Sequence, residues 1–153
     1  PAYFLTWTTR ATWLHGDARG SVDREHNARG TPWLTHDTLR NETNQQRLTR
    51  DPIILSESQR AIVQAAIQRV CDHRAWRLLA VNVRSNHVHL VVVAAGTKPE
   101  VVMGQLKSWA TRDLRANGEI SPTGRIWTNH GSTRWVKDER SLQAAIDYVL
   151  NHQ

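Results

Sequence analysis

Two histidines, one residue apart, are the side chains of this sequence with the plainest chemical use. His87 and His89 lie in residues 86–93 (NHVHLVVV), an apolar run that predicts a strand. Because side chains alternate between the faces of a strand, both histidines point to one face, with Cα atoms about 6–7 Å apart. Two imidazoles at this spacing suit a divalent metal ion. Two surface histidines on an uncovered sheet face are the alternative interpretation.

A tyrosine near the end of the sequence is the second candidate for chemistry. A helix is predicted over residues 138–153, and its apolar residues share one face: Leu142, Ala145, Ile146, Val149 and Leu150. At 100° per residue, Tyr148 falls well off this stripe, and His152 lies one turn further along the same flank. A nucleophilic Tyr148 with His152 reaching a metal explains this placement. A boundary tyrosine with its hydroxyl in water explains it as well.

The charge of the chain indicates the kind of partner. The 153 residues, a length that fits one domain over 1–153, include 20 Lys and Arg against 14 Asp and Glu, a net charge of +6. Only three of the 20 are lysines, so 17 are arginines. The guanidinium fork matches a phosphate, so a nucleic acid is the first partner to consider. A solvated basic surface without a ligand is the alternative.

Composition also excludes several classes of protein. No window approaches the roughly 20 apolar residues that cross a bilayer, so we expect no membrane partner. The single cysteine, Cys71, excludes an internal disulfide and a Cys-based zinc cluster. It lies near the apolar stripe of a predicted helix, where we expect it to be buried. The sequence has no glycine pattern for a phosphate loop or a dinucleotide, so we expect no small-molecule cofactor.

The predicted elements alternate between strands and helices. Strands are expected over 3–9, 76–83 and 87–94, with one or two more within 125–137, and helices over 57–74, 98–117 and 138–153. This order predicts an α+β fold of ferredoxin-like type, an antiparallel sheet with helices on one face. Residues 10–52 have glycines, prolines and no sustained apolar period, so we expect an insertion or lid after the first strand, with at most a short helix near 35–47. The inner face expected for the helix over 98–117 is Val101, Val102, Leu106, Trp109 and Leu114.

These motifs occur together in one known family. Residues 87–89 (HVH) resemble the HUH motif, two histidines around a hydrophobic residue on a central strand, and residues 146–153 (IDYVLNHQ) resemble that family's tyrosine helix. Residues 126–129 (IWTN) and 106–109 (LKSW) also resemble the family's pattern. Over about residues 53–153 and the first strand, the chain is similar to single-tyrosine HUH transposases of the small insertion-sequence and REP-associated type.

The resemblance implies a metal-dependent endonuclease and strand transferase for single-stranded DNA, acting beside a DNA hairpin. By this resemblance Tyr148 attacks a phosphodiester and keeps the 5′ phosphate as a phosphotyrosine. His87 and His89 would hold Mg²⁺ or Mn²⁺, and His152 would be a third ligand. Gln153 would be the third ligand in place of His152 if the phase of the helix differs by one residue.

The resemblance leaves the DNA contacts and the assembly open. Lys107 and Arg112 are the candidates for phosphate contacts, and Arg19 and Arg24 of the insertion are weighed equally as DNA contacts or solvated loop residues. We expect a cytoplasmic, nucleoid-associated bacterial protein, as a monomer or a homodimer. The alternative function is a non-catalytic, basic ferredoxin-like domain that binds nucleic acid without metal or tyrosine chemistry.

Overall fold

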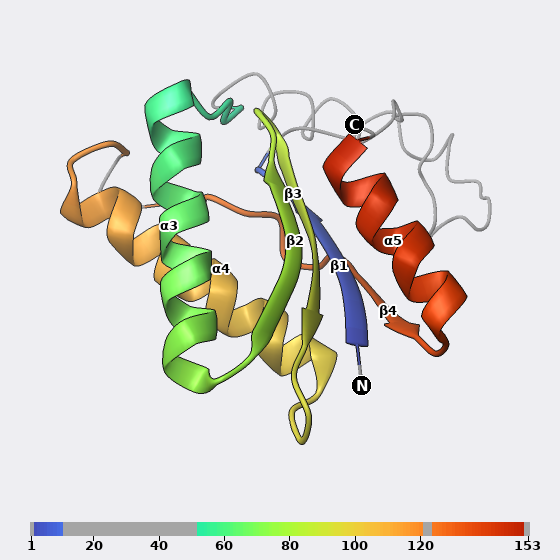
Figure 1. Ribbon diagram of the computed structural model, residues 1–153. Coiled ribbons are helices and arrows are strands. Elements are labelled where there is room, and N and C mark those ends of the chain that lie inside the picture. The colour runs from blue at the N-terminus through green and yellow to red at the C-terminus, as the bar shows by residue number, and fades with distance from the viewer. Residues whose placement is uncertain (1, 11–51, 121–123, 152–153) are drawn as a thin grey trace, which may run out of the picture.

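A four-stranded sheet and three helices make up the described part of the chain (Figure 1). The computed structural model describes residues 2–10, 52–120 and 124–151. Its elements are β1 (Ala2–Thr8), α3 (Glu57–Arg74), β2 (Arg77–Val83), β3 (His87–Val93), α4 (Pro99–Ala116), β4 (Ser132–Val136) and α5 (Glu139–Asn151). All the predicted elements of the described part are present, and the segment 125–137 holds one strand and an isolated bridge. Apart from its end residues, the predicted insertion, with Arg19 and Arg24, lies outside the described residues.

The sheet has the strand order β2-β3-β1-β4, and every neighbouring pair is antiparallel. β2 and β3, the strands predicted over 76–83 and 87–94, form a hairpin, while β1 lies between β3 and β4. An α-helix connects β1 to β2 and another connects β3 to β4, which gives the ferredoxin-like order. The predicted fold class is confirmed.

The helices cover both faces of the sheet, which corrects the expectation that they share one face. Figure 1 shows α3 and α4 on one face and α5 on the other. Val88 and Leu90 face the core under α3 and α4. Val91 faces the opposite way and is buried with Ala80 under Val149 of α5. Since β3 is apolar on both faces, a helix on each side is needed to remove it from water.

The helix α3 begins at a sequence-encoded cap. The Ser56 side chain accepts a hydrogen bond from the backbone N–H of Gln59, and the Gln59 side chain accepts one from the Ser56 N–H. α3 ends at Ala75, whose left-handed backbone (φ 61°) turns the chain into β2. These two signals place both ends of α3 within one residue of the prediction.

The inner face of α4 differs from the prediction at two positions. Val102, Leu106 and Leu114 are buried as expected, but Val101 is 47% exposed and Trp109 is 36% exposed. The buried residues repeat every four positions, and Val101 and Trp109 each lie about 100° away from that row. Their apolar side chains therefore lie on the flanks of the helix.

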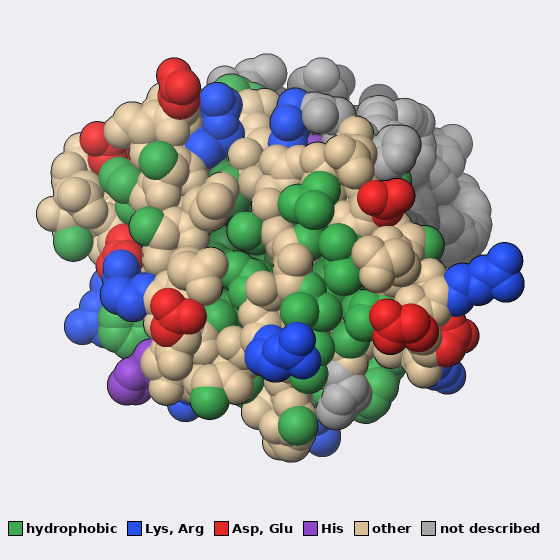
Figure 2. All heavy atoms as spheres, viewed as in Figure 1, with side chains coloured by type: hydrophobic (Ala, Val, Ile, Leu, Met, Phe, Trp, Pro, Cys, Tyr) green, Lys and Arg blue, Asp and Glu red, His purple; other side chains and the backbone are tan. Residues whose placement is uncertain are grey.

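The surface of the described part follows the layers beneath it. Figure 2 shows apolar side chains gathered in the middle of one face, over β2 between α3 and α5, with most charged side chains toward its rim. None of the described helices is long and apolar enough to cross a bilayer.

Burial makes a chemical prediction for Cys71, which is fully buried in α3 as expected. Burial, with a smaller contribution from the charge of Asp72, raises the pKa of the Cys71 thiol to about 11. Because the thiolate is the reactive form, we expect iodoacetamide at pH 8 to label the native protein at least about 100-fold more slowly than the denatured protein. Mass spectrometry of timed samples measures this, and equal rates would contradict the burial of Cys71.

Candidate active site

The two histidines lie side by side on the α5 face of β3. The ring centroids of His87 and His89 are 5.1 Å apart, with the ring planes at 75°. The intervening Val88 is buried on the opposite face, as strand alternation predicted. β1 supports the pair from the next strand, where Thr8 lies opposite His87 and Thr6 lies opposite His89.

Both imidazoles are neutral at pH 7. Burial, with smaller contributions from the charges of His87 and Arg84, lowers the pKa of His89 to about 4. Burial and Arg84 also lower the pKa of His87. A neutral imidazole keeps one nitrogen lone pair, which is the group that a metal ion binds.

The hydrogen bonds of the histidines leave one nitrogen of each suited to a ligand role. His89 is 2% exposed, and its buried Nε2 has no hydrogen-bond partner among the described residues. The Nδ1 of His87 lies 3.1 Å from the side-chain oxygen of Asn86. A hydrogen bond from Nδ1 to Asn86 leaves the Nε2 of His87 with the lone pair. These two nitrogens fit a divalent metal ion.

No third His, Cys, Asp or Glu side chain joins the two histidines within the described part of the chain. Among residues 2–10, 52–120 and 124–151, no group of three His, Cys, Asp or Glu side chains could hold a metal. The predicted third ligand, His152, and its substitute Gln153 lie outside the described residues.

Tyr148 reaches the histidines from the opposite layer. Its ring centroid lies 5.7 Å from that of His89 and 5.9 Å from that of Phe4 in β1, edge to face in both cases. The side chain is 45% exposed, in agreement with its predicted place off the apolar stripe. One chain therefore brings the tyrosine and both histidines together.

A buried side chain and a hydrogen bond to β2 help to hold the last turns of α5 against the sheet. Val149 is fully buried against the sheet, and the side-chain amide of Asn82 in β2 donates to the Val149 carbonyl at 2.9 Å. Asn82 lies directly opposite His89 across the β2–β3 pair. Leu150 was predicted to share the stripe but is 54% exposed, because Val149 takes the position that faces the sheet.

The histidines and Tyr148 line a cleft of about 910 Å³ between the sheet and α5. Its walls include both histidines, Tyr148 and two cationic side chains, Arg134 of β4 and Lys137 after it. Sequence analysis missed both cations, because it did not locate the strand within 125–137 and so could not assign faces to its residues. Strand alternation from a known start would have found Arg134.

A second, basic groove of about 650 Å³ runs between α4 and residues 124–129. None of the described residues that line it is acidic. Four of them are cations: Lys107, Arg112, Arg115 and Arg125. The sequence predicted the first two. Arg115 lies two turns after Lys107 on the same helix, a spacing that could have revealed it.

Hydrogen bonds and a ring contact within the protein orient the cationic side chains of this groove. Lys107 donates to the Thr128 carbonyl at 2.9 Å, and Arg115 donates to the Gly124 carbonyl. Burial and the neighbouring charge of Arg125 lower the pKa of Lys107. The Arg112 guanidinium lies 4.6 Å from the ring centroid of Trp109, which is one of the exposed aromatic side chains. The groove therefore presents oriented cations to an anionic ligand.

The chain matches a protein family, and several solved structures are similar to it. A family model described as "Transposase IS200 like" matches residues 47–152. A REP-associated tyrosine transposase bound to a REP hairpin has a TM-score of 0.51 at 13% identity, covering 97% of this chain and 63% of that chain. A candidate transposase from Deinococcus radiodurans R1 has a TM-score of 0.55 at 14% identity, covering 100% of this chain and 91% of that one. At these identities the two structures show a shared fold, and the comparison with curated proteins gives no match.

The Asn82 hydrogen bond yields a test of how α5 is held. Asn82→Ala leaves the part-buried Val149 carbonyl without its side-chain donor, so we expect a loss of about 1–3 kcal/mol in the free energy of unfolding. Amide exchange near Tyr148 should rise, as measured by hydrogen–deuterium mass spectrometry. The control, Asn151→Ala, removes an exposed contact to Asp147 and should cost less than about 0.5 kcal/mol. Equal effects of the two variants would show that Asn82 does not hold the helix.

Proposed function

The chain belongs to the IS200-like transposases, and from this premise we propose that it cleaves and rejoins single-stranded DNA with Tyr148 as the nucleophile. One observation carries the proposal: Tyr148, His87 and His89 meet in a single cleft. A tyrosine and two histidines, the residues that the proposed phosphotyrosine chemistry needs, converge there from two layers of the fold. Family membership supports a DNA-processing role, and the geometry supports this choice of residues.

We propose that His87 and His89 hold Mg²⁺ or Mn²⁺. The buried, unpartnered Nε2 of His89 and the lowered pKa of both imidazoles support this role. His152 remains the proposed third ligand, with Gln153 as its substitute. When bound, the ion would polarise the scissile phosphate and make its phosphorus more electrophilic.

In the proposed step, the Tyr148 hydroxyl oxygen attacks phosphorus. The new P–O bond forms as the bond from phosphorus to the 3′ oxygen breaks. The phenol proton passes to water, and the 3′ oxygen leaves as a hydroxyl after taking a proton from water. The product is a 5′-phosphotyrosine, which a 3′-hydroxyl can attack in the reverse reaction without ATP. The rings of Phe4 and His89 limit the orientations of the attacking ring.

The basic groove is the proposed site for the DNA backbone. Its cations, from α4 and residues 124–129, support phosphate contacts by Lys107, Arg112, Arg115 and Arg125. The similar transposase bound to a REP hairpin makes hairpin DNA the partner we propose, in the nucleoid of a bacterial cell. A basic domain that binds nucleic acid without cleaving it is the second candidate, favoured by this groove alone.

The first prediction of this proposal concerns the nucleophile. With labelled single-stranded hairpin DNA from the flanks of the gene and Mn²⁺, wild type should form a covalent adduct on a denaturing gel. Tyr148→Phe lacks the attacking oxygen, so its adduct should be undetectable while DNA binding stays within about twofold. His87→Ala, or EDTA with wild type, should reduce adduct formation at least about 100-fold, since the phosphate is no longer polarised.

The outcomes separate the two candidate functions. Salt-sensitive binding by all proteins without any adduct would favour the non-catalytic domain. An adduct that persists in Tyr148→Phe would assign the nucleophile to another residue.

The second prediction concerns the groove. Removing two phosphate contacts with Arg112→Ala and Arg125→Ala should weaken hairpin binding and reduce the slope of log affinity against log salt by about 2. Fluorescence anisotropy at several salt concentrations measures this slope. The control is the double variant Arg77→Ala and Arg140→Ala, which removes two exposed arginines outside the cleft and the basic groove and so loses the same charge. An unchanged slope in the double variant would exclude the groove as the DNA site.

A further inference from the structure

Arg134 is a cation in the cleft to which neither the family match nor the sequence motifs give a role. It lies on β4 directly opposite Phe4 of β1, so its side chain shares the α5 face with Phe4. Its Cζ lies 5.6 Å from the centroid of the Phe4 ring. A guanidinium over an aromatic face is restrained in position while its N–H groups stay available.

The Arg134 guanidinium has no protein acceptor in the described part of the chain. No hydrogen bond or ion pair joins it to residues 2–10, 52–120 or 124–151. Asp138 is the one acidic side chain among the described residues that line the cleft. Its carboxylate accepts a hydrogen bond from the Ser141 N–H at 2.8 Å, at the start of α5, and is used there. The donors of Arg134 are thus left for an anionic ligand.

Ring contacts connect Arg134 to the proposed nucleophile. The Phe4 ring contacts the Arg134 guanidinium on one side. It also contacts the ring of Tyr148, whose centroid is 5.9 Å away. Tyr148 in turn contacts His89. A phosphate that contacts both Tyr148 and His89 therefore lies near the Arg134 guanidinium, which packs on Phe4.

The register of the sheet agrees with this placement. His89 and Ser132 both lie opposite Thr6, and Arg134 is two residues beyond Ser132 on β4. With the usual strand spacing and rise, the Cα atoms of His89 and Arg134 are about 12 Å apart. Both side chains line the same cleft, so a phosphate fits between an imidazole on one side and a guanidinium on the other.

We propose that Arg134 is a catalytic residue that binds a non-bridging oxygen of the scissile phosphate. The inference rests on the proposed function and adds to it a cation supplied by the protein itself. As the Tyr148 oxygen bonds to phosphorus and the 3′ oxygen departs, Arg134 stabilises the charge on the non-bridging oxygens. Arg134 acts only as a hydrogen-bond donor and transfers neither a proton nor an electron. Oriented donors of this kind are most effective where charge develops in the transition state.

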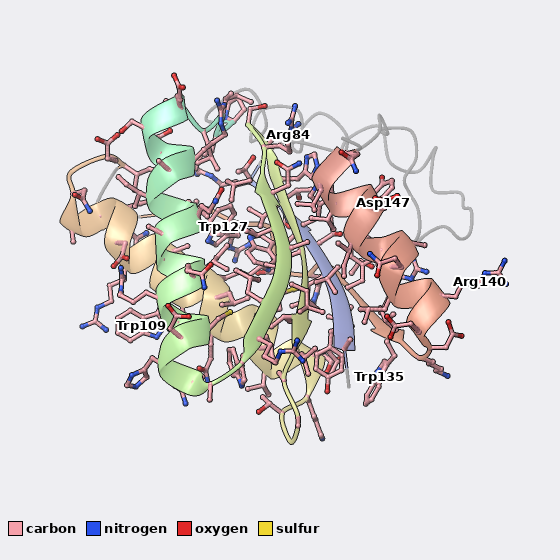
Figure 3. All side chains as sticks on the ribbon, in the orientation of Figure 1. Arg84, Trp109, Trp127, Trp135, Arg140 and Asp147 are labelled. Atoms are coloured by element: carbon pink, nitrogen blue, oxygen red, sulfur yellow. The ribbon has the colours of Figure 1, made fainter. Side chains whose placement is uncertain are left out.

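The test compares single-turnover rates of adduct formation at saturating hairpin DNA with Mn²⁺. Arg134→Gln should reduce the rate about 100- to 1,000-fold, the usual effect of removing one such donor, with DNA affinity changed less than tenfold. Arg134→Lys keeps the charge but loses the planar fork, so its rate should lie between those of wild type and Arg134→Gln. Arg140→Gln is the matched control, because Arg140 projects away from the sheet on α5 and should keep the wild-type rate (Figure 3).

A modified substrate separates a phosphate contact from a structural role. A methylphosphonate at the scissile position replaces a charged non-bridging oxygen with a methyl group. The ratio of wild-type to Arg134→Gln rates should then fall toward one, whereas a folding defect would leave the ratio unchanged.

Three results would overturn the inference. The first is a wild-type rate for Arg134→Gln, and the second is a loss explained entirely by weaker DNA binding. The third is an unchanged ratio on the methylphosphonate. Because wild type is assayed in the same series, a failure of the proposed function itself is recognised separately, as the absence of any wild-type adduct.

Discussion

The antiparallel pairing of β1 with β3 and β4 is the interaction on which the candidate active site depends. β1 is the central partner of both strands, and its residues Phe4, Thr6 and Thr8 face α5. That single row sets His89 on one side and Arg134 on the other. A shift of one residue in either pairing would turn one of these side chains to the opposite face. The core beneath, with Leu5 and Trp7 fully or almost fully buried, opposes such a shift because it would place apolar side chains in water.

Burial sets the charge of the cleft as well as its shape. The sheet and α5 remove His87 and His89 from water far enough to keep both imidazoles neutral. The cationic side chains of the cleft are instead Arg134 and Lys137, at the β4 side. In the proposed function, metal binding and phosphate binding thereby fall to different groups, since a metal ion needs the lone pair of a neutral imidazole and a phosphate needs the N–H donors of a guanidinium.

The cleft and the basic groove are connected through Thr128. Thr128 donates its backbone N–H to the Thr8 carbonyl, and the two hydroxyl oxygens lie 3.1 Å apart. Thr8 lies opposite His87, while Lys107 of the groove donates to the Thr128 carbonyl. A short path of direct contacts thus leads from the cations on α4 to the histidines on β3.

The sequence by itself determined the features that depend on local periodicity. Alternation in the apolar run of β3 placed His87 and His89 on one face, the 100° step of a helix placed Tyr148 off the stripe of α5, and Ser56 marked the start of α3. Only the tertiary structure decided which face of the sheet α5 covers, that Trp109 lies exposed beside Arg112, and that Arg134 lies in the cleft with Tyr148. Periodicity acts between residues a few positions apart, whereas strand pairing and helix packing join residues more than a hundred positions apart. Their outcome depends on which apolar faces remain to be covered once the sheet has formed.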